Sequence, residues 1–121
     1  DIPLYFNLSH SGKYIFCAVS RQEIGVDIQS MEGKVSERIV HRFFAEEEQS
    51  YWENCDTEEK RKCTFYRLWC RKEAYGKLTG EGVVGELGRN LMWNVENKLQ
   101  LLQWEEYNLA EQYQIAVCKW K

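Results

Sequence analysis

Three features are scarce in this 121-residue sequence: proline, long apolar runs and an excess of either charge. Pro3 is the only proline, and no low-complexity linker divides the chain. No apolar run approaches the roughly 20 residues that a membrane-spanning helix requires. The chain has 16 Lys and Arg and 19 Asp and Glu, and the basic residues form no block. This composition argues against nucleic-acid binding. We therefore expect neither a membrane nor a nucleic acid as partner.

The cysteines are odd in number and form no C-x-x-C pair, which argues against a structural zinc site. We expect reduced, mostly buried thiols in a cytoplasmic protein. The chain begins at Asp1 rather than Met and shows no signal peptide, so we expect a part of a longer protein. The cysteines are Cys17, Cys55, Cys63, Cys70 and Cys118.

The composition is that of an ordinary globular domain, with 44% apolar and 29% charged residues. The length fits a single domain, 1–121. Alternating apolar residues predict strands, and apolar residues three and four apart predict helices. The order of elements predicts an α+β fold with an antiparallel β-sheet packed against helices. We also predict a tight turn at residues 9–12 and pairing of the second strand with the third through Arg21 and Gln22. The predicted strands are 3–8, 13–20, 23–29, 90–95, 98–105 and 112–120, and the predicted helices are 36–44, 46–55 and 57–78.

The predicted strand 23–29 carries an acidic residue in its middle. Because side chains alternate along a strand, Ile24 and Ile28 point into a core while Asp27 and Gln29 share the other face. Aspartate is depleted in strands, so the presence of Asp27 in the middle of one suggests a specific role for its carboxylate. Two oxygen donors two residues apart can reach one hard cation. The alternative is a solvated strand face.

The long predicted helix places a carboxylate at the edge of its apolar stripe. Residues four apart share a line along a helix, so Trp69, Glu73 and Lys77 lie on one line. A carboxylate at such an edge is costly unless it is paired or bound to a metal. The alternative is a Glu73–Lys77 pair on the surface. The neighbouring apolar line consists of Tyr66, Cys70, Ala74 and Leu78.

The strand and the helix together predict a site for a metal and a phosphate. Asp27, Gln29 and Glu73 offer three oxygen ligands, which suits Mg²⁺. Lys72 and Lys77 flank Glu73 in the sequence and can neutralise charge that develops on a phosphate.

The segment 9–12 offers a hydroxyl, an imidazole and close backbone approach, which also suits a phosphate. The alternative for His10 is a turn histidine bonded to nearby backbone. The second histidine, His41, lies beside Arg42 in a predicted helix, and we expect it at the surface.

Four short motifs occur in an order that resembles a known enzyme family. They are FNLSHSG at 6–12, GVDIQ at 25–29, FFAEEE at 43–48 and WCRKEAYGKLTGEG at 69–82. Together they look like the 4′-phosphopantetheinyl transferases, specifically the C-terminal lobe of the Sfp type. Residues 90–120 then supply the closing strands, and the N-terminal lobe is absent.

The resemblance implies transfer of the 4′-phosphopantetheine group of coenzyme A to a serine of an acyl or peptidyl carrier protein. The other product is adenosine 3′,5′-bisphosphate, and Mg²⁺ binds the pyrophosphate of coenzyme A. Phosphoryl transfer requires mainly positioning and charge neutralisation, which these residue types can supply. A covalent protein nucleophile is not needed.

The resemblance also implies a role for each matched residue. Asp27, Gln29 and Glu73 are metal ligands, and Glu73 is the candidate base for the serine proton. Lys77 stabilises the pyrophosphate and the leaving group. Glu73, Lys77 and His10 form the implied catalytic set.

Further matched residues are implied to bind coenzyme A or to support the site. The implied phosphate contacts are Ser9, His10, Lys72 and Lys77. For Glu48, at the acidic end of the third motif, we expect a structural role.

Two departures from the family pattern leave the assignment open in part. Gln29 stands where the family often has Glu, which lowers the ligand charge. The absent N-terminal lobe leads us to expect self-association or pairing with that lobe. The small holo-acyl-carrier-protein synthases have a similar length, but their G-x-D-I motif opens the chain, whereas FNLSHSG precedes it here. The sequence is also compatible with a non-catalytic lobe that binds coenzyme A or a carrier protein, and with a plain structural domain.

Overall fold

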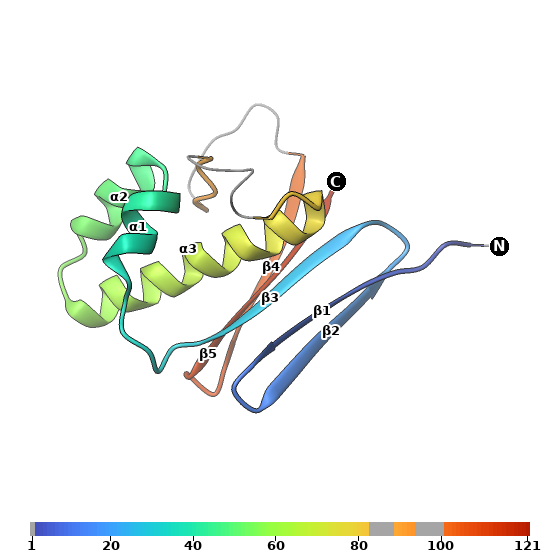
Figure 1. Cartoon of the computed structure of the whole chain (residues 1–121), viewed down its shortest axis with the longest axis horizontal. Coiled ribbons are helices and arrows are strands. Elements are labelled where there is room, and N and C mark those ends of the chain that lie inside the picture. Colours follow the sequence, from blue (N-terminus) through green and yellow to red (C-terminus); the bar gives the residue numbers. More distant parts are fainter. Residues whose placement is uncertain (1, 83–88, 94–100) are drawn as a thin grey trace.

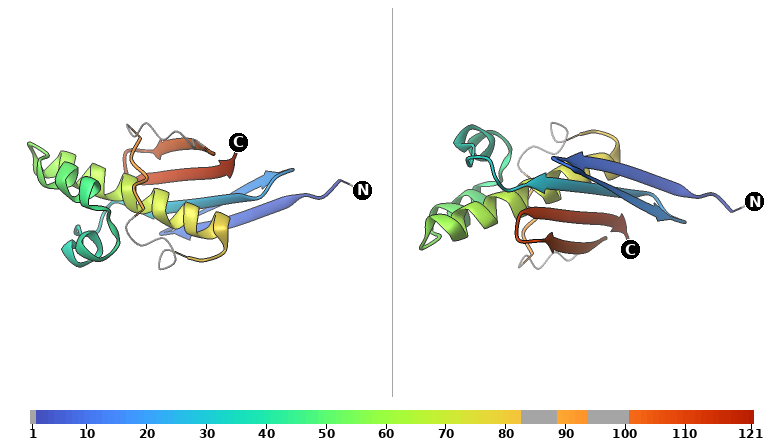
Figure 2. Two further views of the ribbon diagram at one scale, coloured as in Figure 1. Left: turned by 90° about the horizontal axis from the view of Figure 1, so that it is seen from above. Right: turned by 90° about the horizontal axis from the view of Figure 1, so that it is seen from below.

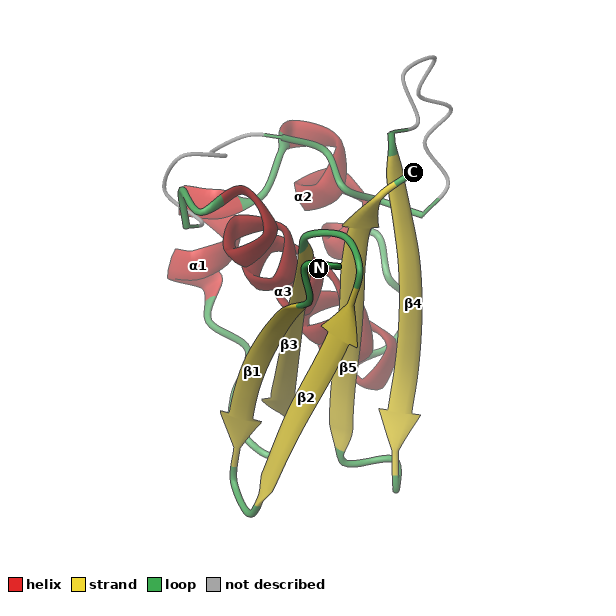
Figure 3. Cartoon of the chain, turned by 90° about the vertical axis from the view of Figure 1, so that its right-hand side faces the viewer, coloured by secondary structure: helices red, strands yellow, loops and turns green. Residues whose placement is uncertain are grey.

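The computed structural model describes residues 2–82, 89–93 and 101–121, which fold into three layers. Helix α3 crosses one face of a three-stranded sheet (Figure 1), and the β1–β2 hairpin lies against the opposite face (Figure 3). The predicted α+β fold with an antiparallel sheet against helices is confirmed. The elements are β1 (Tyr5–Ser11), β2 (Tyr14–Ser20), β3 (Ile24–Ser30), α1 (Glu37–Phe43), α2 (Glu46–Glu53), α3 (Glu58–Thr79), β4 (Leu102–Leu109) and β5 (Tyr113–Trp120).

The central sheet contains three antiparallel strands in the order β3–β5–β4. In its register Asp27 of β3 lies opposite Ala116 of β5. β1 and β2 pair only with each other among the described strands. The predicted pairing of the second strand with the third is therefore wrong, because β5 takes one edge of β3 and β1 meets the other edge through its side chains.

Side chains of β1 satisfy the outer edge of β3. Three alternate residues of β1 each accept a hydrogen bond from a backbone N–H of β3, because alternate side chains of a strand share one face. These small polar groups take the N–H donors that would otherwise be open to another strand, so the hairpin protects this edge. The three bonds join Asn7 Oδ1 to Val26 N at 2.9 Å, Ser9 Oγ to Ile28 N at 3.1 Å, and Ser11 Oγ to Ser30 N at 2.9 Å.

Both faces of β3 are covered. Ile28 packs with Tyr113 and Ile115 beneath Phe16 of the hairpin. Asp27, on the other face, lies under α3 and is only 4% exposed. The solvated strand face considered for Asp27 is therefore wrong, since a helix rather than water covers the polar side of this strand.

Gly25 allows α3 to cross β3 at very close range. A Cβ atom at this position would lie 2.7 Å from the backbone nitrogen of Leu78 and closer still to the backbone oxygen of Ala74. Backbone atoms of a helix cannot move aside as a side chain can. Glycine here therefore keeps α3 against the strand, which brings Glu73 of the helix near Asp27 of the strand.

The helices begin and end at residues with ordinary capping chemistry. Thr57 Oγ1 accepts the N–H of Lys60 at 3.1 Å at the start of α3, and Gly80 ends the helix with a φ of 76°. Ser36 caps α1 in the same way by accepting the N–H of Ile39. The predicted helix starts at Ser36 and Thr57 are confirmed.

The apolar residues form one cluster among the helices and another between α3 and the sheet. Figure 2 shows α1 and α2 gathered beside one end of α3, where Val40, Phe44 and Leu68 are buried. Trp69 packs on this cluster, with its ring 5.4 Å from that of Phe43. The predicted apolar line of α3 is buried, as expected; its members are Tyr66, Cys70, Ala74 and Leu78.

Three local predictions are wrong. Residues 90–93 form no strand, and the last two positions of the predicted strand 90–95 lie outside the described residues. The strand predicted at 98–105 begins at Leu102 and continues to Leu109, while 98–100 lie outside the described residues. The predicted turn at 9–12 is displaced, because β1 continues through Ser11 and the chain turns at Gly12 and Lys13.

The five cysteines are free thiols, but only Cys70 and Cys118 are buried, so the prediction of mostly buried cysteines is wrong. His41 is exposed, as predicted, with Nδ1 3.3 Å from Gln49 Oε1. In the described ranges no helix is both long and apolar enough to cross a membrane.

Candidate active site

Asp27 lies beneath α3 with both carboxylate oxygens hydrogen-bonded. Ser9 Oγ donates to Oδ1 at 3.1 Å, and Gln29 Nε2 donates to Oδ2 at 2.7 Å. Cys70 Sγ donates to the backbone oxygen of Asp27 at 3.2 Å. Burial raises the pKa of Asp27, although the Gln29 bond and the charge of Lys77 oppose that rise. A buried carboxylate with a perturbed pKa and several polar partners is typical of a functional site.

Glu73 approaches Asp27 from the helix side. Its side chain is half-buried, and it makes no hydrogen bond within the described residues. Burial raises the pKa of Glu73, the negative charge of Asp27 raises it further, and Lys77 lowers it. A carboxylate with a raised pKa and unoccupied lone pairs is suited to accept a proton from a hydroxyl group.

Lys77 is the cation of this cluster. Its Nζ atom lies 3.8 Å from Asp27 Oδ1 and donates to the backbone oxygen of Leu8 at 3.1 Å. The side chain is 33% exposed, so it lies between the buried carboxylate and solvent. The ion pair that Lys77 forms is with Asp27 rather than with Glu73, so the surface-pair alternative does not describe this residue.

The family resemblance implies a Mg²⁺ ion, which binds through oxygen ligands. Across 2–82, 89–93 and 101–121, no three His, Cys, Asp or Glu side chains are placed to share a metal ion. Asp27 and Glu73 nevertheless fit such an ion as two carboxylate ligands, because their charges repel and Mg²⁺ accepts few protein oxygens together with water. Gln29 here donates its amide N–H to Asp27, and its role as a ligand stays a prediction.

Lys72, which was predicted to contact phosphate beside Glu73, is instead buried in an ion pair with Glu48. Its Nζ atom is 2.6 Å from Glu48 Oε1, and both side chains are almost fully buried. Glu48 also accepts the N–H groups of Ala45 at 2.7 Å and Leu91 at 2.9 Å. Glu48 thus joins α2, α3 and the segment 89–93, which agrees with the structural role expected for it. The position of Lys72 gives no support to a phosphate contact.

Ser9 and His10 point to opposite sides of β1. Ser9 is buried against β3, whereas His10 is exposed and lies opposite Ile15 on the outer face of the hairpin. A turn at 9–12 would have allowed the two side chains to converge, but a strand through Ser11 separates them because its side chains alternate. The structure therefore brings Ser9 to Asp27 and does not bring His10 there.

One charged cluster was not predicted from the sequence. Glu106 of β4 forms ion pairs with Arg67 and Arg71 of α3, and Arg67 lies over the ring of Trp93 at 3.7 Å. Burial alone raises the pKa of Glu106, but hydrogen bonds and charge from Arg71 and Arg67 outweigh it, so the pKa is lowered. The i, i+4 spacing of the two arginines was the available signal. These contacts join α3 to β4.

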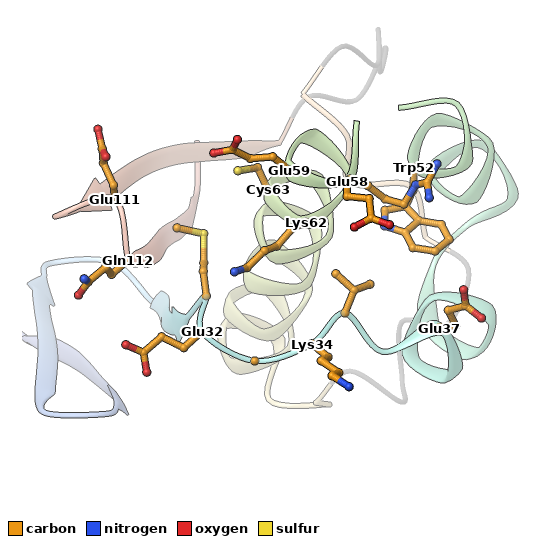
Figure 4. A pocket seen from close by; sticks show the side chains of 14 residues that line it. Glu32, Lys34, Glu37, Trp52, Glu58, Glu59, Lys62, Cys63, Glu111 and Gln112 are labelled. Carbon is orange, nitrogen blue, oxygen red and sulfur yellow. The ribbon is translucent and has the colours of Figure 1, made fainter. Parts of the chain in front are cut away.

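A pocket of about 730 Å³ lies away from the predicted site, at the N-terminal end of α3 (Figure 4). Trp52 and Glu58 line one end of it, and Glu32 and Gln112 lie toward the other. No predicted site residue lines this pocket. The Asp27–Glu73–Lys77 cluster therefore depends on the close crossing of α3 over β3 and not on this cavity.

Residues 23–118 match the family model of the 4′-phosphopantetheinyl transferase superfamily. This range includes β3, α3 and most of β5, and therefore Asp27, Glu73 and Lys77. The chain belongs to the 4′-phosphopantetheinyl transferase superfamily. The β1–β2 hairpin precedes the matched range, although Ser9 and Leu8 contact the site.

Curated relatives agree with this assignment. The chain is 33% identical to 4′-phosphopantetheinyl transferase psf-1 of Bacillus pumilus over 128 residues, covering 98% of this chain and 54% of that protein. It is 39% identical to 4′-phosphopantetheinyl transferase Sfp of Bacillus subtilis (strain 168) over 84 residues, covering 69% and 37%. It is 29% identical to 4′-phosphopantetheinyl transferase gsp of Aneurinibacillus migulanus over 106 residues, covering 88% and 43%. The chain spans about half the length of these relatives or less.

Proposed function

We propose that this chain transfers the 4′-phosphopantetheine group of coenzyme A to a serine of an acyl or peptidyl carrier protein, with Mg²⁺. The other product is adenosine 3′,5′-bisphosphate. Membership of the superfamily and the names of the relatives support this class of reaction. The observation that carries the proposal is the meeting of Asp27 and Glu73 beside Lys77, where α3 crosses β3.

The proposed reaction exchanges one phosphorus–oxygen bond for another. The serine oxygen forms a bond to the phosphorus of the phosphopantetheine group, and the bond from that phosphorus to adenosine 3′,5′-bisphosphate breaks. Glu73 accepts the serine proton, directly or through water, and its raised pKa suits that step. Lys77 offsets negative charge on the leaving phosphate. Mg²⁺, when bound, neutralises charge on the pyrophosphate; Asp27 and Glu73 would hold it, with Gln29 as a proposed further ligand.

Four residues are proposed to contact the phosphates of coenzyme A, and their positions support the roles unequally. Lys77 is partly exposed beside the carboxylates, which suits a phosphate contact. His10 is exposed on the outer face of the hairpin, so its proposed contact and catalytic role require coenzyme A to extend around that hairpin. The buried positions of Ser9 and Lys72 favour supporting roles.

The outer face of the β1–β2 hairpin supports a proposal about assembly. Phe6, Leu8, Ile15 and Val19 are 52–76% exposed there, and Phe6 lies opposite Val19 in the register. An apolar face of this kind is typical of a surface that another protein part covers. We propose that a second copy of this chain or an N-terminal lobe covers it, with residues 1–121 acting as a C-terminal lobe. A cytoplasmic location stays a prediction.

The main alternative is a non-catalytic lobe that binds coenzyme A or a carrier protein. The retention of Glu73 without a hydrogen-bond partner in the described residues favours the enzyme, because a binding lobe has no need of a carboxylate held beside another carboxylate. The two functions differ in whether a covalent product forms.

Intact mass spectrometry of an apo carrier protein tests the transferase proposal. The carrier protein is incubated with this chain, coenzyme A and Mg²⁺, and the expected result is a mass gain of one phosphopantetheine group. Glu73→Ala is expected to abolish the gain. Glu59→Ala, which removes an exposed carboxylate from the same helix, is expected to leave it unchanged.

The results separate the proposed functions. Equal gain with Glu73→Ala contradicts the role of Glu73. No gain with the unmodified chain, together with coenzyme A binding by calorimetry, favours the binding lobe, and the reaction is then repeated with an added N-terminal lobe. Light scattering tests assembly: a monodisperse monomer contradicts self-association.

A further inference from the structure

Two consecutive residues of β1 contact the charged groups of the site. The backbone oxygen of Leu8 accepts a hydrogen bond from Lys77 Nζ at 3.1 Å. The hydroxyl of Ser9, the next residue, lies 3.1 Å from Asp27 Oδ1. β1 therefore contacts the cation with its backbone and the carboxylate with a side chain.

The hydrogen bonds of Ser9 define the direction of its hydroxyl proton. Ser9 Oγ accepts the backbone N–H of Ile28 at 3.1 Å, which uses one of its lone pairs. A serine hydroxyl has a single proton to donate. That proton is directed to Asp27 Oδ1, while the amide of Gln29 donates to Oδ2. The two oxygens of Asp27 are thus held by different donors, which determines the plane of the carboxylate.

We propose that Ser9 is a positioning residue for Asp27 and that β1, through residues 8 and 9, sets the geometry of the Asp27–Lys77 pair. This inference rests on the proposed function, in which Asp27 is a metal ligand. Ser9 is 6% exposed, and its bonds are made to β3. Its hydroxyl is therefore directed to the proposed ligand Asp27. The hairpin contributes to the site although it precedes the range that matches the family.

The same strand provides a matched control. Ser11 also accepts a backbone N–H of β3, from Ser30 at 2.9 Å. Among the described residues, however, Ser11 donates no hydrogen bond to a carboxylate. Ser9→Ala and Ser11→Ala each remove one bond between hairpin and sheet, but only Ser9→Ala removes a donor to Asp27. A difference in Mg²⁺ affinity between these variants therefore reports the orientation of Asp27. It does not report how tightly the hairpin packs on the sheet, because each variant loses one bond between the two.

Mg²⁺ affinity is the first readout and is measured by calorimetry on the unmodified chain and three variants. Removal of a residue that orients a metal ligand typically weakens affinity about 10- to 100-fold, and we expect the Kd to rise at least about 10-fold with Ser9→Ala. Ser11→Ala is expected to change the Kd less than about twofold. Ser9→Thr keeps a hydroxyl and is expected to restore most of the affinity.

The carboxyl ¹³C resonance of Asp27 without metal is the second readout, measured at one neutral pH. We expect it to shift with Ser9→Ala and to stay in place with Ser11→Ala. Equal weakening of Mg²⁺ binding by both variants, or an unmoved Asp27 resonance with Ser9→Ala, overturns the inference. If the unmodified chain binds no Mg²⁺, the metal part of the proposed function fails, and the resonance alone then decides whether Ser9 orients Asp27.

Discussion

Two lysine–carboxylate pairs toward the C-terminal half of helix α3 differ in almost every physical respect. Lys72 and Glu48 are 2.6 Å apart, with 3% and 0% of their side chains exposed. Lys77 and Asp27 are 3.8 Å apart, and Lys77 is 33% exposed. The lysines are five positions apart in the sequence, and both are implied to contact phosphate by the family resemblance. Only the second pair has one member open to solvent.

The difference shows how burial divides charged residues between structure and function. Glu48 accepts two backbone N–H groups in addition to Lys72, so its hydrogen-bonding capacity is used within the protein. Such a pair is strongly destabilising to break, because the remaining partner becomes an uncompensated buried charge. At the other pair, Glu73 adds a second carboxylate that has no hydrogen bond in the described residues. An arrangement of this kind can still bind a cation or accept a proton.

The largest expected effect is the loss of stability on breaking the buried pair. Lys72→Met leaves Glu48 without its cation in a place that water does not reach. We expect the free energy of unfolding to fall by about 3–5 kcal/mol, measured by urea denaturation. Should the variant not fold, the milder Glu48→Gln is used and is expected to be destabilised in the same direction. A loss below about 1 kcal/mol would contradict the structural role of this pair.

The same substitution at the open pair is expected to affect activity rather than stability. Lys77→Met removes a long, partly exposed ion pair, so the free energy of unfolding should change by less than about 1 kcal/mol. Loss of charge stabilisation at the leaving phosphate should lower the transfer rate by about 100-fold. Single-turnover mass spectrometry and urea denaturation measure the two quantities. Equal transfer by Lys77→Met and the unmodified chain would remove Lys77 from the proposed mechanism.

The smallest expected effect is on the pH dependence of stability without added metal. The pKa values of Asp27 and Glu73 are raised by burial above the ordinary 3.8 and 4.5. The folded chain therefore holds these protons to higher pH than the unfolded chain. Their contribution to stability is complete below the ordinary values and is lost as pH rises through the raised ones.

Glu106 acts in the opposite direction at lower pH. Its pKa is lowered below 4.5, so its contribution is present above that value and is lost as pH falls through the lowered one. Urea denaturation across the acid range should therefore show stability that rises with pH and then declines. The double variant Asp27→Asn with Glu73→Gln should lose the decline and keep the rise. A decline that persists in this variant would assign it to other groups.

Much of the fold followed from local sequence patterns. Thr57 and Ser36 were identified as helix caps because their side chains bond the helix start over three residues. The buried line of α3 was predicted because helical periodicity is local. The strand predicted at 90–95 does not form at residues 90–93, since the alternation there does not report whether a neighbouring strand is available for pairing.

The sequence by itself determined the superfamily, the capped helix α3, and the placing of Asp27 on β3 and Glu73 on α3. Tertiary structure alone decided that Lys77 lies beside Asp27 while Lys72 is buried with Glu48, and that Ser9 faces Asp27 while His10 faces away from it. The physical reason is the distance along the chain over which each kind of information acts. Periodicity along a helix or strand states which side chains share a face, but only packing between distant segments states what that face meets.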